Sequence, residues 1–200
     1  MHPIIALSVL ETVRAFDLET GDAPDDPYAG QEAIKLGRTT SVAAQIERYR
    51  SMVRRGDALP GEELAALFTL VSRRPDADWV FADAGRRAGR HAARQTPRFL
   101  KMLHWGLPSG MRERLGRRLI RGTAARVFDL DVGLDGQGAV AADGCGAHRV
   151  PGGRPCGVYG SALAELFRTF ISFDGAYFRN ACRARGSVSC RWSTTQQQED

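Results

Sequence analysis

The residues best suited to chemistry are four cysteines, all in the last third of the 200-residue chain. Cys182 and Cys190 flank a predicted turn near Gly186, so an antiparallel hairpin would place their thiols opposite each other or one diagonal apart. Cys156 begins a predicted helix that packs on this hairpin, where the helix dipole favours a thiolate. Three thiolates and one more ligand suit tetrahedral zinc, so these residues predict a structural rather than a catalytic metal site.

The spacing of the cysteines leaves two other interpretations open. Twenty-five residues separate Cys156 from Cys182 and seven separate Cys182 from Cys190, unlike the short CxxC knuckle of zinc ribbons. The three side chains could instead be small buried hydrophobes, or two could form a cross-strand disulfide. We expect a cytoplasmic address, because Glu11 and Arg14 interrupt an apolar N-terminal stretch that lacks the features of an export signal. That address favours thiols or metal ligands over disulfides.

A second chemical feature is an arginine block at 86–126. Between positions 84 and 128 the only acidic residue is Glu113. This charge favours an anionic partner, namely nucleic acid, lipid headgroups or a carboxylated small molecule, although a solvated helical face would also explain it. No run of about 18 uncharged apolar residues occurs, so we expect no transmembrane segment. The basic residues are Arg86, Arg87, Arg90, Arg94, Arg98, Lys101, Arg112, Arg114, Arg117, Arg118, Arg121 and Arg126.

Helices are predicted to position these groups through the middle of the chain. The cluster beginning at Thr39 supplies an N-cap for the first of them, and Gly56 ends it. Asp76 is expected to cap the third, and Pro97 and Pro108 divide the basic stretch. Five helices are predicted in this stretch. They cover 39–55, a segment that has Pro60 in its first turn, a segment from 76 to about 94, 98–105, and 108–121.

Strands and a last helix follow, because the apolar period changes after residue 126. A glycine-rich turn at 133–138 predicts one β-hairpin, and a turn at Gly186 predicts another. Between them, a loop at 144–155 leads into the helix that starts near Cys156. The predicted strands are 127–132, 139–141, 176–182 and 188–194.

These elements predict an α/β (α+β) fold, with an antiparallel sheet covered by a helical layer and a helical N-terminal region. Residues 18–38 are rich in Asp, Gly and Pro and are expected to form a flexible linker. The predicted organisation is an N-terminal segment and linker (1–38), a helical region (39–126), an α/β module (127–194) and a polar tail (195–200).

The run CGVYGSALAELFRTFISFDGAYFRNACRARGSVSCRW contains a cysteine after a glycine-rich loop, the pair Leu166 and Phe167, and a closing hairpin CxARGxxxC. These features resemble the 4-vinyl-reductase domain, a small-molecule-binding module named from bacteriochlorophyll biosynthesis and also found in phenol-responsive transcription activators. The resemblance extends over about 139–194, and 84–119 is similar more loosely to bacteriochlorophyll-pathway members. It implies a TRAPP-like fold in which helices and an antiparallel sheet enclose a pocket for a hydrophobic ligand.

The resemblance also implies a structural zinc bound by the cysteines that match Cys156, Cys182 and Cys190. The acidic fourth ligand of the family falls at Arg179, a cation that cannot coordinate zinc. We favour a replacement on the loop before Cys156, because that loop can fold back onto the site. The candidates for the fourth ligand are Cys145 and His148, which we favour, and Asp174 or a water.

A pocket for an aromatic acid needs apolar walls and cations for its carboxylates. Ordinary core packing is the alternative for each aromatic residue. The candidate walls are Phe99, Trp105, Phe128, Tyr159, Phe167 and Phe170. The candidate polar contacts are Arg90, Arg94 and Arg98 for carboxylates, and His91 and His104 for a central magnesium.

The sequence thus predicts a small-molecule-binding protein for a hydrophobic carboxylated aromatic, such as a tetrapyrrole or bacteriochlorophyll intermediate, with a structural zinc site. The alternatives are an 8-vinyl reductase subunit and an aromatic-ligand sensor that acts through a partner in transcription regulation. No Rossmann, P-loop, HExxH or GxSxG motif occurs, so we expect binding rather than catalysis by this chain alone. A homodimer through the helical layer is a further candidate, because family members often pair that way.

Overall fold

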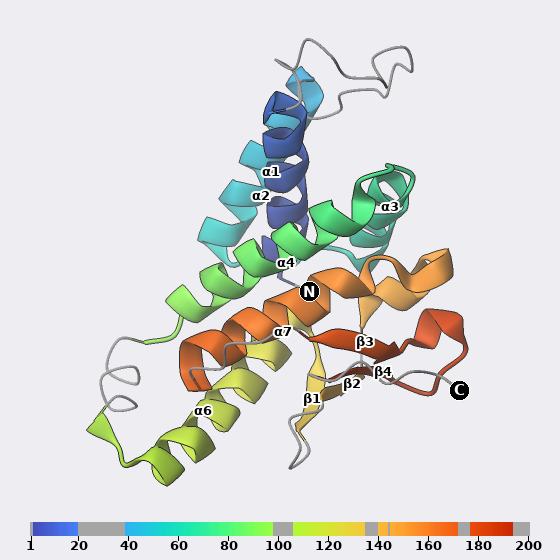
Figure 1. Cartoon of the computed structure of the whole chain (residues 1–200). Coiled ribbons are helices and arrows are strands. Elements are labelled where there is room, and N and C mark those ends of the chain that lie inside the picture. Colours follow the sequence, from blue (N-terminus) through green and yellow to red (C-terminus); the bar gives the residue numbers. More distant parts are fainter. Residues whose placement is uncertain are drawn as a thin grey trace.

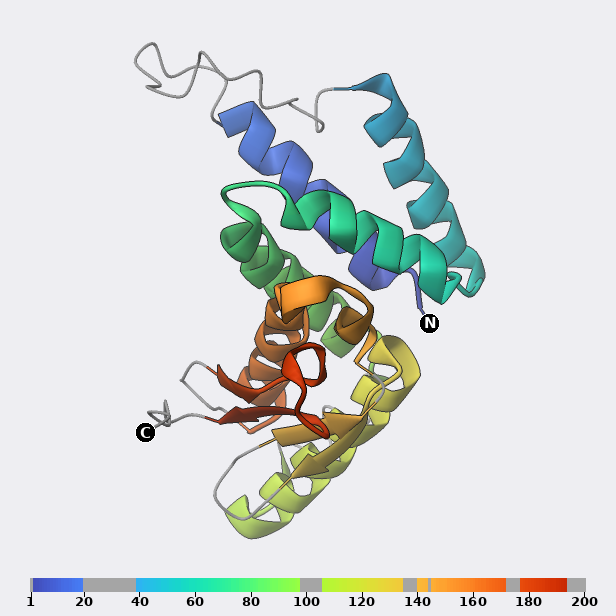
Figure 2. The same cartoon turned by 90° about the vertical axis from the view of Figure 1, so that its right-hand side faces the viewer.

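The computed structural model describes residues 2–19, 39–97, 106–134, 140–143, 145–171 and 177–193. It confirms the α+β class, because helices cover an antiparallel sheet with the strand order β1-β2-β4-β3 (Figure 1, Figure 2). The helices are α1 (Ile4–Glu19), α2 (Thr40–Arg55), α3 (Gly61–Ser72), α4 (Ala77–Arg94), α6 (Ser109–Thr123) and α7 (Cys156–Ile171). The strands are β1 (Asp131–Leu134), β2 (Val140–Asp143), β3 (Phe178–Ala181) and β4 (Cys190–Ser193).

The sheet consists of two antiparallel pairs joined side by side. β1 pairs with β2, β3 pairs with β4, and β4 also pairs with β2. The sequence predicts that the first strand begins at residue 127, but Ala124–Phe128 form a π-helical turn that continues α6. That boundary is wrong because Val127 and Phe128 are buried from a helical turn, and their apolar character mimics the alternation of a strand.

Helix α7 is the central element, and both α4 and α6 pack against it (Figure 1). Two glycines of α4 allow a close approach. A Cβ on Gly85 would overlap the carbonyl oxygen of Val158, and a Cβ on Gly89 would lie 2.7 Å from that of Ala162. Backbone atoms of α7 occupy the space that these side chains would need, so a larger residue at position 85 or 89 would push the two helices apart.

Helix α1 is part of the same hydrophobic core as the rest of the chain. It packs against α2 and α4, although the sequence places residues 1–38 in an N-terminal segment and linker (Figure 1). The remainder of that segment, 20–38, lies outside the described residues. The apolar residues that α1 buries are Ile4, Ile5, Ala6, Leu7, Val9, Leu10 and Val13.

The described helices between residues 39 and 128 follow the sequence closely. The Thr39 hydroxyl accepts a hydrogen bond from the backbone N–H of Val42, and Gly56 ends α2 in the left-handed conformation, as expected. Pro60 precedes α3 instead of lying in its first turn. The predicted helix at 98–105 and the tail at 195–200 lie outside the described residues. No described helix combines the length and apolar character that a bilayer-spanning segment needs.

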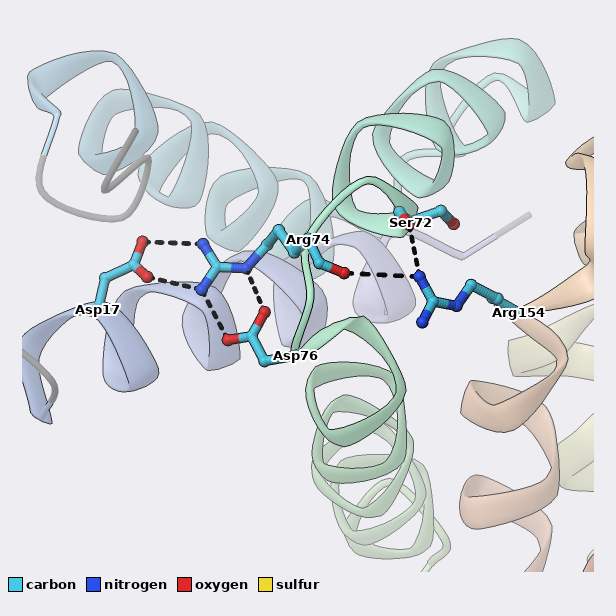
Figure 3. Close-up of polar contacts among 5 residues, drawn as sticks. All are labelled: Asp17, Ser72, Arg74, Asp76 and Arg154. Carbon is cyan, nitrogen blue, oxygen red and sulfur yellow. Dashed lines mark hydrogen bonds and ion pairs between the residues drawn. The ribbon is translucent and has the colours of Figure 1, made fainter. Parts of the chain in front are cut away.

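A partly buried ion-pair network joins α1 to the corner between α3 and α4 (Figure 3). The Arg74 guanidinium donates to the carboxylates of Asp17 at 2.7 Å and Asp76 at 2.8 Å. Asp76 occupies the N-cap position of α4, but its side chain makes no cap hydrogen bond, so that prediction is wrong. Arg154, just before α7, donates to the backbone carbonyl of Ser72 at 2.9 Å. The corner therefore fixes the start of α7 relative to the N-terminal helix.

Candidate metal centre and basic cleft

Four segments bring the cysteines together at the N-terminal end of α7. Cys156 is the first residue of α7, and Cys190 is the first residue of β4. Cys182 follows the end of β3, and Cys145 precedes a short 3-10 helix at Gly146–Arg149. All four are buried free thiols, and together they are called the cysteine cluster below.

Cys156 is the residue through which the cysteine cluster is connected. Its sulfur lies 3.7 Å from Cys145 Sγ, 3.2 Å from Cys182 Sγ and 3.7 Å from Cys190 Sγ. The sulfurs of Cys145, Cys156 and Cys190 all lie within 4.8 Å of one another. These three buried side chains could hold a metal ion, and Cys182 contacts one of them, Cys156.

The dimensions of the cysteine cluster suit a tetrahedral metal site. Zinc binds thiolate sulfur at about 2.3 Å, so four sulfurs at the corners of a tetrahedron stand about 3.8 Å apart. Two contacts of Cys156, at 3.7 Å, match that edge closely, and the third, at 3.2 Å to Cys182, is about 0.6 Å shorter. Cys182 does not belong to the set of sulfurs within 4.8 Å of one another, so a four-sulfur tetrahedral ion would require Cys182 to move relative to the other three.

The thiols of the cysteine cluster differ in their readiness to ionise. Hydrogen bonds from Cys145 and Cys156 lower the pKa of Cys190 despite its burial. Hydrogen bonds with Cys145 and Cys190, together with burial, raise the pKa of Cys156 far above that of a free thiol. A bound cation would favour ionisation of the thiols that ligate it.

Arg179 lies beside the cysteine cluster and supports a turn there instead of binding a metal ion. Its guanidinium donates to the carbonyl oxygen of Gly153 at 2.7 Å. Gly153 has a φ of +62°, and a Cβ there would lie 2.6 Å from Cys182 Sγ, so a side chain would collide with the thiol. Arg179 thus holds the turn that supports Cys182, while Cys145 supplies the additional sulfur.

The predicted aromatic walls lie in the protein core. Phe128, Tyr159, Phe167 and Phe170 are each at most 5% exposed, so they pack with core residues rather than line an open cavity. Arg94 is exposed at the C-terminal end of α4. The candidate residues that lie outside the described part of the structure are Arg98, Phe99, His104, Trp105, Asp174 and the side chain of His148.

A cleft of about 360 Å³ opens between α1, α2 and α4, on the side of α4 that faces away from α7. Its apolar floor comes from Ile4 and Leu7 of α1 and Val53 of α2. The sequence misses these contributions because the helices that supply them meet only in the folded chain. The cationic and imidazole side chains that line this basic cleft are Arg50, Arg54, Arg87, Arg90, His91 and Arg94.

The arginines of the basic cleft differ in whether they are neutralised. Arg50 and Arg87 pair with carboxylates of α1 and α4 at 2.8 and 2.6 Å. Arg54, Arg90 and Arg94 have no ion-pair partner among the described residues. These three guanidiniums can therefore donate hydrogen bonds to an anion without giving up an existing pair.

His91 contributes a neutral side chain to the basic cleft. Burial lowers the pKa of His91, and the nearby charge of Arg94 lowers it further. A neutral imidazole can donate one hydrogen bond and accept another, which suits a polar group on a ligand.

The described residues thus form two sites with separate chemistry. The cysteine cluster offers sulfur ligands to a metal ion, and the basic cleft offers guanidiniums above an apolar floor. No family model, curated protein or solved structure matches the chain.

Proposed function

We propose that this protein binds a hydrophobic small molecule that carries a carboxylate, and that the basic cleft is its binding site. The observation that carries the proposal is the meeting of three unpaired arginines, Arg54, Arg90 and Arg94, above an apolar floor. Ligand sites typically combine apolar surface with a few convergent polar groups in about 300–1,000 Å³. At about 360 Å³, the cleft would enclose one aromatic acid or one carboxylated edge of a tetrapyrrole.

The second part of the proposal is that the cysteine cluster binds a structural zinc ion. The sulfur separations, the complete burial and the all-thiol ligand set support zinc in a closed four-coordinate site. Zinc would hold the start of α7, β4 and the loop before α7 together. The resemblance to the 4-vinyl-reductase domain supports the same metal, and it favours a tetrapyrrole or bacteriochlorophyll intermediate as the ligand. The parts of the basic cleft that come from α1 and α2 lie outside the segments that resemble this family.

Replacing Arg90 and Arg94 together with glutamine is expected to weaken ligand binding by roughly 100-fold or more. Each charge-assisted hydrogen bond contributes about 1.5–3 kcal/mol, and 1.4 kcal/mol corresponds to a factor of ten. The probe is Mg-protoporphyrin IX, titrated by fluorescence quenching, with its dimethyl ester as the ligand that lacks carboxylates. The matched control variant replaces Arg118 and Arg121, exposed arginines of α6, with glutamine.

The control variant should bind the acid as the wild type does, and the ester should bind weakly to every form. Equal affinity of the wild type for acid and ester would overturn the proposed role of the carboxylate. Equal affinity of the Arg90 and Arg94 variant and the wild type would remove the basic cleft as the site.

The affinity of the cleft for this probe should fall as pH rises from about 5.5 to 8. In the free protein the pKa of His91 is lowered by burial and by Arg94, while Glu11 opposes this effect. A bound carboxylate would raise that pKa, so the complex takes up a proton and binding is tightest below the pKa of the free histidine. Calorimetry in two buffers of different ionisation enthalpy measures this uptake. His91→Asn should abolish this proton uptake. The control is His2→Asn, at a neighbouring histidine, which should keep it. Unchanged uptake in His91→Asn would show that His91 is not the group that takes up the proton.

A further inference from the structure

Helix α6 carries most of its charge on one face. The twenty residues from Ser109 to Phe128 contain six arginines and one glutamate, so their formal charge equals the +5 of the whole chain. Successive residues of a helix are about 100° apart around its axis, so positions 114, 117, 118 and 121 all fall within an arc of about 100°. This α6 stripe consists of Arg114, Arg117, Arg118 and Arg121.

Most of the α6 stripe is exposed and unpaired. Arg114, Arg118 and Arg121 are exposed and have no ion-pair partner among the described residues. Arg117 is partly exposed and pairs with Glu113 at 2.8 Å. The stripe therefore presents three free guanidiniums along about 10 Å of helix.

The described part of the chain leaves this face of α6 open. The opposite face buries Ile120 and packs against α7, with α4 on the far side of α7 (Figure 1). A Cβ on Gly110 or Gly122, near the two ends of α6, would have nothing within 4 Å among the described residues. Glycine lowers the stability of a helix by about 1 kcal/mol relative to alanine. Close packing does not explain the glycines at positions 110 and 122, because the space beside them is open.

We propose that the α6 stripe binds duplex DNA through its phosphates, with α6 lying in the major groove. The groove of B-DNA is wide enough for an α-helix, and the three free guanidiniums can reach the phosphates that border it. Exposed glycines at both ends of α6 would let its backbone approach the DNA backbone closely. Sequence specificity is not part of the proposal, because phosphate contacts do not distinguish bases.

The surface chemistry favours DNA over the other polyanions. A helix that lies on a membrane inserts an apolar face, whereas the apolar face of α6 packs against α7. Double-stranded RNA has a deep, narrow major groove that does not admit a helix. The α6 stripe and the basic cleft lie on opposite sides of α7, so this proposal does not depend on ligand binding (Figure 1).

The test is fluorescence anisotropy with a labelled 20-base-pair DNA duplex at 50–300 mM salt. We expect micromolar affinity at 50 mM salt and a slope of log K against log salt of about −3, because three phosphates are neutralised. Replacing Arg114, Arg118 and Arg121 with glutamine should remove binding, and Arg118→Gln alone should reduce the slope by about one. The control of equal charge replaces Arg54, Arg90 and Arg94 of the basic cleft with glutamine, and it should retain the wild-type slope.

Three results would overturn the proposal: no binding to the DNA at 50 mM salt, equal affinity for an RNA duplex of the same sequence, or an equal loss in the two triple variants. Binding to phosphatidylserine vesicles without binding to DNA would assign the α6 stripe to a membrane instead. Circular dichroism of each variant confirms that it is folded before binding is measured.

Discussion

Replacing Cys156 with serine is expected to abolish zinc binding and to lower the melting temperature by roughly 7–20 °C. Cys156 contacts the other three sulfurs of the cysteine cluster, so its loss removes the ligand that connects them. Structural zinc contributes roughly 10–16 kcal/mol to zinc-finger peptides. A third of that value in a 200-residue chain corresponds to a change of roughly 7–20 °C.

The measurement compares thermal melting with and without a chelator, together with metal analysis of the purified proteins. The chelator should lower the melting temperature of the wild type to near that of Cys156→Ser, and it should leave the variant unchanged. Ala164→Ser adds a hydroxyl to another buried position of α7 and should keep its zinc. A Cys156→Ser protein that retains one zinc per chain would contradict the assignment.

Replacing Gly85 with alanine should destabilise the protein by about 3 kcal/mol, which is a fall of about 6–12 °C in melting temperature. Alanine normally stabilises a helix relative to glycine by about 1 kcal/mol, so the expected change has the opposite sign. The new methyl group would overlap the Val158 carbonyl oxygen and lie 2.7 Å from Ser161 Cβ. Relief of this overlap requires α4 to move away from α7.

Gly122→Ala is the matched control, because its Cβ would meet open space in a described helix of similar length. This variant should be neutral or more stable by up to about 1 kcal/mol. Urea unfolding followed by circular dichroism measures both. Equal stability of Gly85→Ala and the wild type would show that α4 and α7 do not pack as closely as described.

The metal centre and the basic cleft are connected through this helix pair. Helix α7 begins at Cys156, one of the cluster cysteines, and α4 packs against it through Gly85 and Gly89 while lining the cleft with its opposite face. Arg154 adds a second link, because it binds the corner between α3 and α4 just before α7 begins (Figure 3). If the cysteine cluster holds the proposed zinc, its removal would therefore disturb the support of the basic cleft as well as the module that contains the cysteines.

Local sequence signals predicted much of this architecture. The caps at Thr39 and Gly56 set the ends of α2, and the turn signal at Gly186 placed Cys182 and Cys190 at adjoining positions of one hairpin. These features depend on residues close together in the chain, so their geometry follows from backbone rules. Cys145 was among the candidates for a fourth ligand, and its place in the cysteine cluster depends on the fold of its loop.

Features that depend on distant packing could not be predicted in the same way. Helix α1 has no narrow apolar stripe because both α2 and α4 cover it. The Thr12 hydroxyl of α1 donates a hydrogen bond to the Asp83 carboxylate of α4, which is seventy-one residues away in the chain. The basic cleft exists only because α1 and α2 meet α4, so Arg90 and Arg94 were recognised while Ile4 and Leu7 were not. The sequence assigns Phe128 to a strand because burial in a helical turn and burial in a strand leave the same apolar signal.

The central claim is that four cysteines bind one zinc ion, and zinc K-edge X-ray absorption of the purified protein tests it most directly. The expected result is one zinc per chain with four sulfur neighbours at about 2.3 Å, and no nitrogen or oxygen in the first shell. The Cys145→Ser variant should replace one of these sulfurs with a lighter atom. A wild-type protein without bound zinc, or zinc surrounded mainly by nitrogen and oxygen, would contradict the account.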